Sequence, residues 1–539
     1  MEGIHQYFTG WDWAVLFGYL ILTTWVGHAL RGQQASIKDF FAGGRSLPWL
    51  AVSGSIIATE ISGVTFIGVP GGVMAANGDF TYLIWGIGSI IGRVIVGTVF
   101  TRVFYEDNIY SPYDYMGRRI KPQLKTLATV FFTIGSILGQ SVRVLVAALP
   151  LMIVTPFSFE VCILIIGVFA IGWTLMGGMR TVIWTDVMQF ALFTFGGLLT
   201  VFWIAGHLEG GIGQIFQQAG EAGKTQVLDF RFGLSDAFRF TFWVAIIAVP
   251  FQNLAAFGVD QLNAQRMFCC KNAHEASKAI IWSSVGQAIT YLMLVVGAAL
   301  FVWYANHPPE GMVAETFNWQ QDTREPGKGR GDYVFPTWIV TQLPPGLSGL
   351  ILGAIFAAAI SSLDSILAAL SQTTISVLYN PERQTEQDQT SLVRQSRIWV
   401  VIWGVFLTAF TLLMRWMKEA AGVPILPLAF QMTTYTLGPL LGMFLCALLG
   451  KGSFRGILIG SLVSVLLVIL SRPDVWHLLH FAGMPYEWPA ALPSFELSSV
   501  DGKQGLKPLI GFYWAWPVTT IITLCGGLLL GSRKSATKA

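Results

Sequence analysis

An apolar stretch from Leu350 to Ser376 is long enough to cross a bilayer, yet polar side chains interrupt its middle and inner half. These side chains belong to Ser361, Ser362, Asp364, Ser365 and Gln372. At about 100° per residue, the three serines share one helix stripe with Ala358, and Asp364 lies on its flank. Na⁺ takes about five or six oxygen ligands, which hydroxyls and backbone carbonyls supply with little net charge. The stripe therefore predicts a sodium site.

Serines also occur at helix interfaces in membranes, where small side chains permit close packing and bond back to the preceding turn. Packing explains the serines without any ion. It does not explain Asp364, because an intramembrane carboxylate costs about 2.5 to 3.5 kcal/mol on insertion scales and usually marks an ion pathway. Asp364 therefore favours the ion site.

Membrane helices must position this stripe. The chain has 539 residues, of which 53% are hydrophobic and 12% charged, as in a polytopic membrane protein and unlike a soluble enzyme. The net charge of +3 is distributed among loops, so we expect no nucleic-acid partner.

Hydropathy predicts roughly thirteen spans. They lie at about 11–30, 48–77, 80–105, 125–154, 158–177, 181–206, 238–260, 276–304, 346–376, 397–416, 423–449, 454–472 and 511–532.

Basic residues in short connections predict the orientation, with the N-terminus outside and the C-terminus in the cytoplasm. The predicted cytoplasmic connections include Lys38, Arg118, Arg266, Lys451 and Lys534. The first span lacks a basic leader and a small-residue cleavage site, so we expect a retained helix. We expect the longer outer segments to form loops or short surface helices; they are 208–237, 306–343 and 473–508.

Two predicted spans are interrupted in the same way. The second contains Gly63 and Pro70, and the seventh contains Pro250 and Gly258. Corresponding interruptions in two halves of a chain indicate an inverted repeat with a substrate site at the midplane. Unwound backbone there exposes carbonyls to ions and N–H groups to substrate. For either span alone, the frequency of Gly and Pro in membrane helices is an alternative explanation.

Three separated motifs occur along the chain. They read DFFAGGRSLP from Asp39 to Pro48, GGMRTVIWTDVMQF from Gly177 to Phe190, and GVDQLNAQRMFCCK from Gly258 to Lys271. Together they closely resemble the sodium:solute symporter family, which includes sodium/glucose, iodide, multivitamin and sialic acid cotransporters. The resemblance covers the chain from about Trp11 to Gly450. It implies an all-α polytopic membrane protein with a LeuT-like inverted repeat of five plus five helices and extra helices at both ends.

The resemblance also implies how the chain is divided. We expect an N-terminal extra helix with a cytoplasmic loop, a first repeat half, an outer loop, a second repeat half and C-terminal extra helices. These parts correspond to residues 1–47, 48–206, 207–237, 238–450 and 451–539.

The family shares a sodium site made of carbonyls from its first and eighth core helices and two hydroxyls on the eighth. Its ligands match Ala58, Ile61, Ala358, Ser361 and Ser362 in this sequence. The hydroxyl stripe described above thus coincides with the ligands that the resemblance implies.

Some members hold a second sodium ion nearer the cytoplasm. Asp186 matches the aspartate of that site, and Asp364 and Ser365 lie where its helix oxygens would be. Local pairing of Asp186 with Arg180 is the alternative. The number of sodium ions, one or two, stays open.

The substrate positions differ from those of the sugar carriers. Thr65, Ile84, Gln287 and Thr434 match positions where those carriers have Gln, Glu, Lys and Gln, so glucose or galactose is not expected. Sialic-acid-transporting members are more similar, with an arginine that matches Arg143 and hydroxyls that match Ser62 and Thr65.

Arg143 lies deep within apolar sequence. A guanidinium keeps its proton and offers a planar fork that suits a carboxylate. Glu60 stands where the family usually has a neutral residue, so Arg143 either meets an anionic substrate or neutralises Glu60. Asp260 and Gln261 match a family position near the substrate and the inner gate. Aromatic residues could form the pocket walls and gates or simply pack; they are Phe66, Trp85, Phe430 and Tyr435.

We expect a Na⁺-driven symporter of the plasma (inner) membrane that imports a small organic solute by alternating access, with a carboxylate or a sugar acid such as a sialic-acid-like compound as substrate. We expect it to work as a monomer in the lipid bilayer, with no organic cofactor. A neutral sugar, a vitamin or an inorganic anion is an alternative substrate. An H⁺-coupled carrier that uses Glu60, Asp186 or Asp364 is an alternative mechanism. A sensor module is disfavoured because the tail after Ser532 is short for a signalling domain. A membrane enzyme is disfavoured because no HExxH, nucleophile elbow or phosphate loop occurs in a sensible context.

Overall fold

The computed structural model describes residues 3–30, 43–107, 109, 111–176, 179–327, 330–379, 386–421, 424–481, 483–500 and 503–530. Parts of two sequence motifs, Asp39 to Ala42 and Gly177 to Gly178, lie outside the described residues. Lys38 and Lys534, which the orientation argument uses, also lie outside them.

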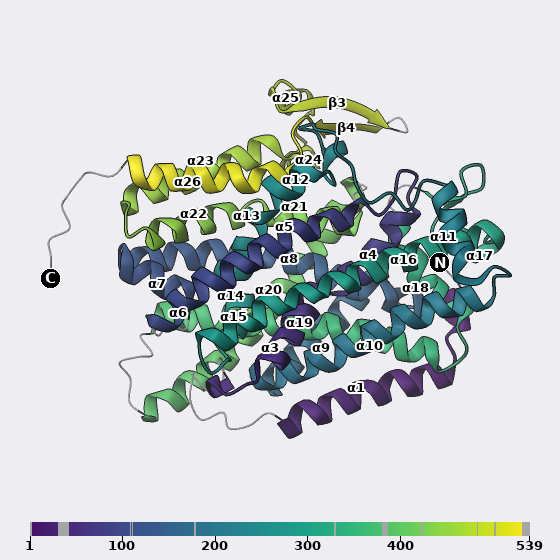
Figure 1. Ribbon diagram of the computed structural model, residues 1–539, viewed down its shortest axis with the longest axis horizontal. Helices are drawn as coiled ribbons and strands as arrows, with labels where there is room; N and C mark the ends of the chain where they lie inside the picture. The colour runs from purple at the N-terminus through teal and green to yellow at the C-terminus, as the bar shows by residue number, and fades with distance from the viewer. Residues whose placement is uncertain are drawn as a thin grey trace.

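Long helices that run roughly along one direction form a bundle (Figure 1). Within the described ranges, nine helices are long and apolar enough to cross a membrane, and a bent helix pair brings the number to ten. A helix satisfies its backbone polar groups internally, and apolar side chains on nearly all faces match the lipid. Such helices therefore suit a bilayer. The nine helices coincide with nine of the thirteen predicted spans. The total of thirteen, the domain boundaries and the orientation stay predictions.

The helices of the first half of the chain come in this order: α1 (Gly10–Leu30), α3 (Trp49–Glu60), α4 (Gly63–Met74), α5 (Trp85–Ile95), α6 (Thr101–Glu106), α7 (Pro112–Arg119), α8 (Pro122–Val154), α9 (Phe159–Met176), α10 (Met179–Gly206) and α11 (Gly211–Glu221). The second half contains α12 (Phe242–Ile247), α13 (Val249–Asn253), α14 (Gln261–Met267), α15 (Ala273–Trp282), α16 (Gln287–Asn306), α17 (Gly311–Thr316), α18 (Gly331–Gln342), α19 (Leu347–Leu378), α20 (Glu386–Ala421), α21 (Ile425–Thr433), α22 (Leu437–Leu448), α23 (Phe454–Ser471), α24 (Pro473–Phe481), α25 (Glu487–Ala490) and α26 (Ala515–Leu529).

Both spans that the sequence marks as interrupted are broken. α3 and α4 meet at an angle of 50°, and Ile61 between them has a non-helical ψ of 74°. Ser62 begins α4 by accepting a hydrogen bond from the Val64 N–H at 3.3 Å. In the second break, α12 and α13 continue into a π-helical segment, Leu254–Val259, and extended Asp260 then begins α14.

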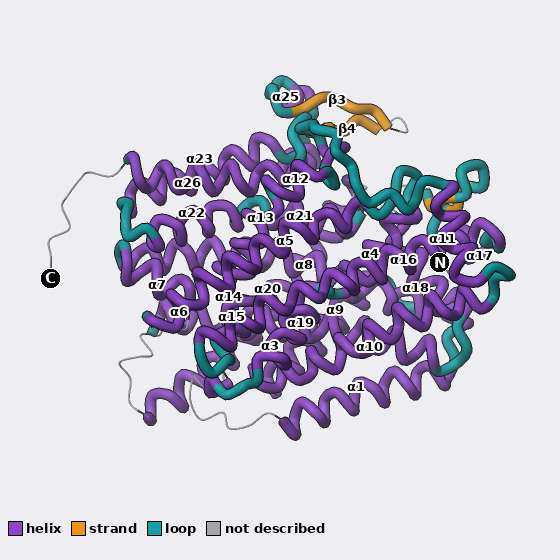
Figure 2. Tube along the Cα trace, viewed as in Figure 1, coloured by secondary structure: helices purple, strands orange, loops and turns teal. Residues whose placement is uncertain are grey.

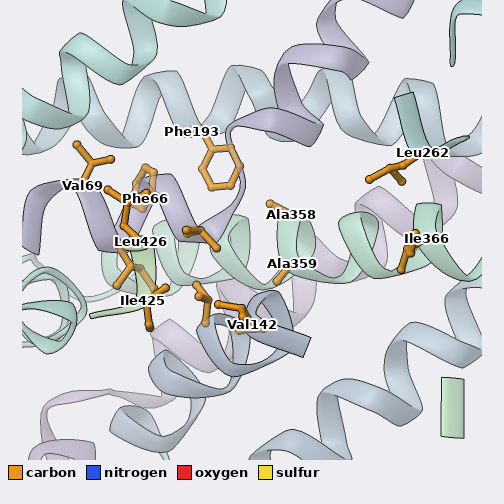
Figure 3. Packing of buried hydrophobic residues seen from close by; sticks show 14 of the residues in the cluster. Phe66, Val69, Val142, Phe193, Leu262, Ala358, Ala359, Ile366, Ile425 and Leu426 are labelled. Carbon is orange, nitrogen blue, oxygen red and sulfur yellow. The ribbon is translucent and has the colours of Figure 1, made fainter. Parts of the chain in front are cut away.

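α19 lies at the centre of the bundle and packs against α1, α8, α9, α10 and α20. Nearly all of its residues are buried. Figure 3 shows Ala358 and Ala359 on α19 between Phe193 of α10 and Val142 of α8. Small side chains at these positions allow neighbouring helices to approach closely. The polar stripe of α19 is therefore enclosed by protein.

Two outer segments differ from the expected loops and surface helices. α18 is almost entirely buried and packs against α4 and α8. The segment after α24 contains an antiparallel hairpin of β3 (Phe495–Val500) and β4 (Lys503–Pro508), which projects from one edge of the bundle (Figure 1). A shorter hairpin pairs β1 (Trp319–Gln320) with β2 (Glu325–Pro326). Figure 2 shows these strands as small additions to a helical protein.

The position of Arg266 contradicts one step of the orientation argument. The sequence placed it in a cytoplasmic connection, but it lies on α14 with a fully buried side chain. It therefore does not report on the side of the membrane.

Candidate functional site

A cavity of about 200 Å³ lies beside the break between α3 and α4. Its wall comes from α3, α4, α5, α8, α13, α14, α16, α21 and α22. It brings together six of the eight residues that the sequence predicts for the substrate: Glu60, Ser62, Thr65, Arg143, Asp260 and Gln287. Broken helices expose polar backbone to a cavity, which is where transporters of this architecture hold their cargo.

One face of α8 supplies polar atoms to the cavity. Ser136, Gln140 and Arg143 are three or four residues apart, so they share that face. Ser136 Oγ, Gln140 Oε1 and Arg143 Nη1 are buried without a hydrogen-bond partner among the described residues. Unpaired buried polar atoms are costly, so they mark places where a ligand or water completes the hydrogen bonding.

Glu60 does not neutralise Arg143. Its carboxylate instead forms an ion pair and a hydrogen bond with Arg93 of α5. Gln287 Nε2 donates to the other carboxylate oxygen at 3.3 Å. Arg143 makes no ion pair with any carboxylate in the described part of the chain, although it shares the cavity with Glu60. Asp260 and Glu60 act on Arg143 only at longer range, so its Nη1 donor is available to a ligand.

The predicted shared sodium ligands lie on α3, on α19 and at the break. The Thr65 and Phe66 N–H groups both donate to the Ser62 carbonyl, at 2.9 and 3.1 Å. The Ile61 carbonyl consequently loses its helical donor, as expected for an oxygen that faces an ion. On α19, the hydroxyl of Ser361 donates to Asp186, and Ser362 is buried. Carbonyl and hydroxyl oxygens are the ligand types that a hard cation prefers, so the sodium site stays a prediction.

Asp186 of α10 lies in a buried network that joins four helices. It accepts hydrogen bonds from Ser55 of α3 and Ser361 of α19, and it forms an ion pair with Arg266 of α14. The predicted alternative partner, Arg180, is absent from this network. Ser365 belongs to it, because Arg266 Nη2 donates to Ser365 Oγ at 2.7 Å.

Within the described residues, Asp364 makes no hydrogen bond to this network. It is buried and bonds to Thr174 of α9, and Asp186 and Arg266 lie within its electrostatic reach. The structure thus brings Asp186 and Ser365 together through Arg266, with Asp364 near the network but not bonded to it.

Two residues of the predicted substrate set lie away from the cavity wall. Gln261 Nε2 donates to Gln372 Oε1 of α19 at 3.0 Å. Thr434 is fully buried and its hydroxyl donates to the Gln431 carbonyl at 2.6 Å. Asp260, which does line the cavity, also caps α14 by accepting from the Leu262 N–H at 2.8 Å.

Aromatic rings form part of the cavity wall and pack behind it. Trp85 and Phe430 line it with ring centroids 4.9 Å apart, and Trp516 of α26 packs on both rings at 5.8 and 6.3 Å. We call these three residues the aromatic roof. The other two predicted gate residues lie elsewhere. Phe66 packs between Phe193 and Phe335, and the Tyr435 hydroxyl donates to Asp474 at 3.1 Å.

Sequence reasoning overlooked Arg93 and the buried position of Arg266. Arg93 lies inside a predicted span, so the rule that singled out Arg143, that intramembrane charges are functional, applies to it equally. Arg266 follows a broken span directly and was counted as a loop residue. No pattern in the sequence indicates its partners.

A family model of the sodium:solute symporter family matches residues 40–460 of this chain. The sodium/sialic acid symporter SiaT of Proteus mirabilis (strain HI4320) is 28% identical over 467 residues, which are 86% of this chain and 89% of that protein. The human sodium-coupled monocarboxylate transporter 1 is 28% identical over 475 residues, which are 85% and 73% of the two chains.

A solved structure shows a similar fold. It is a Na⁺-coupled sialic acid symporter in a substrate-bound, outward-open state, with a TM-score of 0.77 at 24% identity. The match covers 98% of this chain and 100% of that one. The expected LeuT-like fold is confirmed. This chain belongs to the sodium:solute symporter family and is a Na⁺-coupled, multi-pass membrane symporter.

Proposed function

We propose that this protein imports a small organic carboxylate together with Na⁺, and that the substrate carboxylate binds Arg143. The observation that carries the proposal is the arginine itself, which faces the cavity with Nη1 unpaired. Glu60 already has its own partner in Arg93. Asp260 lies within electrostatic reach of Arg143 but forms no ion pair with it within the described residues. A buried guanidinium with a free donor favours an anion, and its planar fork can bind a carboxylate through two hydrogen bonds.

The polar wall of the cavity favours a substrate with hydroxyl or amide groups in addition to the carboxylate. Hydroxyl and amide side chains from several elements line it, among them Ser62, Ser89, Gln140, Asn263 and Thr290. A sugar acid can satisfy such groups, and a neutral sugar would leave the Arg143 guanidinium without a directly bound anion. Sialic acid symporters among the relatives support this substrate class.

We further propose that Na⁺ binds the carbonyls of Ala58, Ile61 and Ala358 and the hydroxyls of Ser361 and Ser362. Such an ion holds α3 against α19, which stabilises the conformation in which the cavity opens outward. A ligand shifts a conformational equilibrium only by its differential affinity for the two states. The membrane potential adds about 2.3 kcal/mol per charge per 100 mV to inward Na⁺ movement. The protein would work as a monomer in the plasma (inner) membrane, with the N-terminus outside.

Uptake into proteoliposomes tests the proposal. With an inward Na⁺ gradient, we expect the purified protein to accumulate labelled N-acetylneuraminate or another hydroxylated carboxylate, and not glucose. Arg143→Gln should lower the apparent affinity about 100-fold or more, because the substrate charge loses a buried partner. Arg102→Gln removes an exposed arginine of α6 and serves as the matched control. Equal uptake by Arg143→Gln and the wild type would contradict the proposal, as would uptake that a K⁺ gradient supports equally well.

A further inference from the structure

In the ion pair between Glu60 and Arg93, only Glu60 lines the cavity. The Arg93 side chain is fully buried, whereas the Glu60 side chain is 25% exposed and lines the cavity. Behind Glu60, Arg93 Nη1 donates to Ser283 Oγ at 2.8 Å, and its guanidinium lies 4.3 Å from the centre of the Phe257 ring. Arg93 is thus fixed in the wall, and Glu60 is the member of the pair that a substrate can reach.

Glu60 has acceptor capacity left over. A carboxylate offers about four lone-pair sites. Within the described residues, two donors reach this one, Arg93 at Oε2 and Gln287 at Oε1. The Gln287 bond is long at 3.3 Å, so Oε1 is open to a stronger donor. Hydrogen bonds to ionised acceptors are roughly twice as strong as neutral ones.

The charge balance indicates the kind of donor. Arg93 compensates the charge of Glu60, so the pair as a whole is neutral. A neutral hydroxyl or amide N–H therefore matches it without an added desolvated charge, whereas an ammonium group would bring an unbalanced one. Ser89 lies one turn before Arg93 on α5, and its hydroxyl is also buried without a partner at the cavity wall. It adds a second hydrogen-bonding group on the same side.

We propose that Glu60 determines the substrate specificity of this cavity by accepting hydrogen bonds from hydroxyl or amide groups of the substrate. This inference rests on the proposed function, in which Arg143 binds the carboxylate. The substrate must then carry both an anionic end and neutral donors. Carboxylates with a bare hydrocarbon chain have no donor for Glu60 and bind weakly. Sites built for hydrogen bonding reject ligands that lack the matching group.

Gluconate and hexanoate provide matched probes, since they share chain length and charge and differ in hydroxyls. We would measure the affinity of each for the purified full-length protein in Na⁺ by calorimetry. The wild type should prefer gluconate. Glu60→Gln keeps the shape of the side chain and removes its charge; it should weaken gluconate binding about 10- to 100-fold and change hexanoate binding less than about threefold. Glu106→Gln is the control, because the Glu106 side chain is exposed on α6.

Glu60→Gln also removes the counter-charge of Arg93 and could impair folding. The double variant Glu60→Gln/Arg93→Met removes both charges, and the Na⁺-dependent thermal shift reports whether each variant is folded. A folded variant that loses affinity for both acids by the same factor would overturn the inference and leave the role of Arg143 intact. A wild-type protein that binds neither acid, nor any other carboxylate, would overturn the proposed function and the inference together.

Discussion

Arg266 Nη2 lies 3.2 Å from Asp186 Oδ2 in a fully buried ion pair between α14 and α10. The same guanidinium donates to Ser55 Oγ at 3.0 Å and to Ser365 Oγ at 2.7 Å. The pair therefore ties α3 and α19, which carry the proposed sodium ligands, to the segment that follows the second helix break.

Arg266→Met should be strongly destabilising, because it leaves the Asp186 carboxylate buried without its counter-charge. Breaking a buried pair in this way costs about 3 to 5 kcal/mol. Asp186→Asn/Arg266→Met, which removes both charges, should recover part of that loss. Chemical unfolding in detergent measures both effects, with Arg102→Met as the exposed control. Equal stability of the single and double variants would show that the ion pair contributes little.

Na⁺ should raise the unfolding temperature of the wild type relative to K⁺ or choline. At 100 times its Kd, an ion that binds only the folded state adds about 2.7 kcal/mol. Ser361→Ala/Ser362→Ala should abolish this difference. Ser371→Ala is a control on the same helix, since the buried Ser371 hydroxyl donates to the Ser396 carbonyl at 2.7 Å. A sodium effect that survives in the double variant would place the ion elsewhere.

Gly71→Ala should separate α4 from α18. A Cβ atom at Gly71 would lie 2.5 Å from the Gly331 carbonyl oxygen, and both groups are backbone, so neither can rotate away. We expect a loss of about 1 to 3 kcal/mol. Gly72→Ala is the matched control, because a Cβ there meets nothing within 4 Å. Thermal unfolding of the two variants should differ, and equal values would mean that the helices adjust at little cost.

Lys224, in the predicted outer segment after α11, should make the stability of the protein depend on pH in the alkaline range. Burial lowers the pKa of Lys224, and Glu325 opposes that shift. Its ammonium donates to the Ala75 carbonyl at the end of α4 at 2.6 Å. The unfolded state, with a pKa near 10.5, binds more protons than the folded state between the two pKa values. Stability therefore rises with pH in that window.

The test compares the wild type with Lys224→Met. The unfolding free energy of the wild type should increase relative to that of Lys224→Met as pH rises from neutral to about 10. Lys271→Met, at an exposed position, should leave the pH dependence unchanged. A difference that is flat with pH would show that Lys224 keeps an ordinary pKa.

Helix breaks and the stripe on α19 could be predicted because each is local in sequence. Gly63 directly follows the first break, whereas Pro70 lies inside α4. The spacing of Ser361, Ser362 and Ser365 sets their common face. The partners of Glu60 and Asp186 could not be predicted in this way. Arg93 and Arg266 come from distant helices, and one sequence does not tell which of several charged residues a carboxylate will meet.

The β3–β4 hairpin was missed although a local signal exists. An Asp-Gly pair at 501–502 separates two short runs that precede the last span, and this pair is a strong hairpin signal. The high polarity of the segment favoured a loop assignment. The burial of α18 had no comparable signal, because its position depends on the close approach of Gly331 to Gly71.

The aromatic roof joins two parts of the protein that are far apart in the chain. Trp85 belongs to the first half of the chain. Phe430 and Trp516 belong together on the other side, since the Trp516 indole donates to Thr433 at 3.1 Å and α26 packs along α22. Trp85 also donates to the Arg239 carbonyl at 2.8 Å. If the transport cycle separates Trp85 from Phe430, water reaches the indole, and the tryptophan emission should then report that step. Comparison with Trp85→Phe isolates that emission from the other tryptophans.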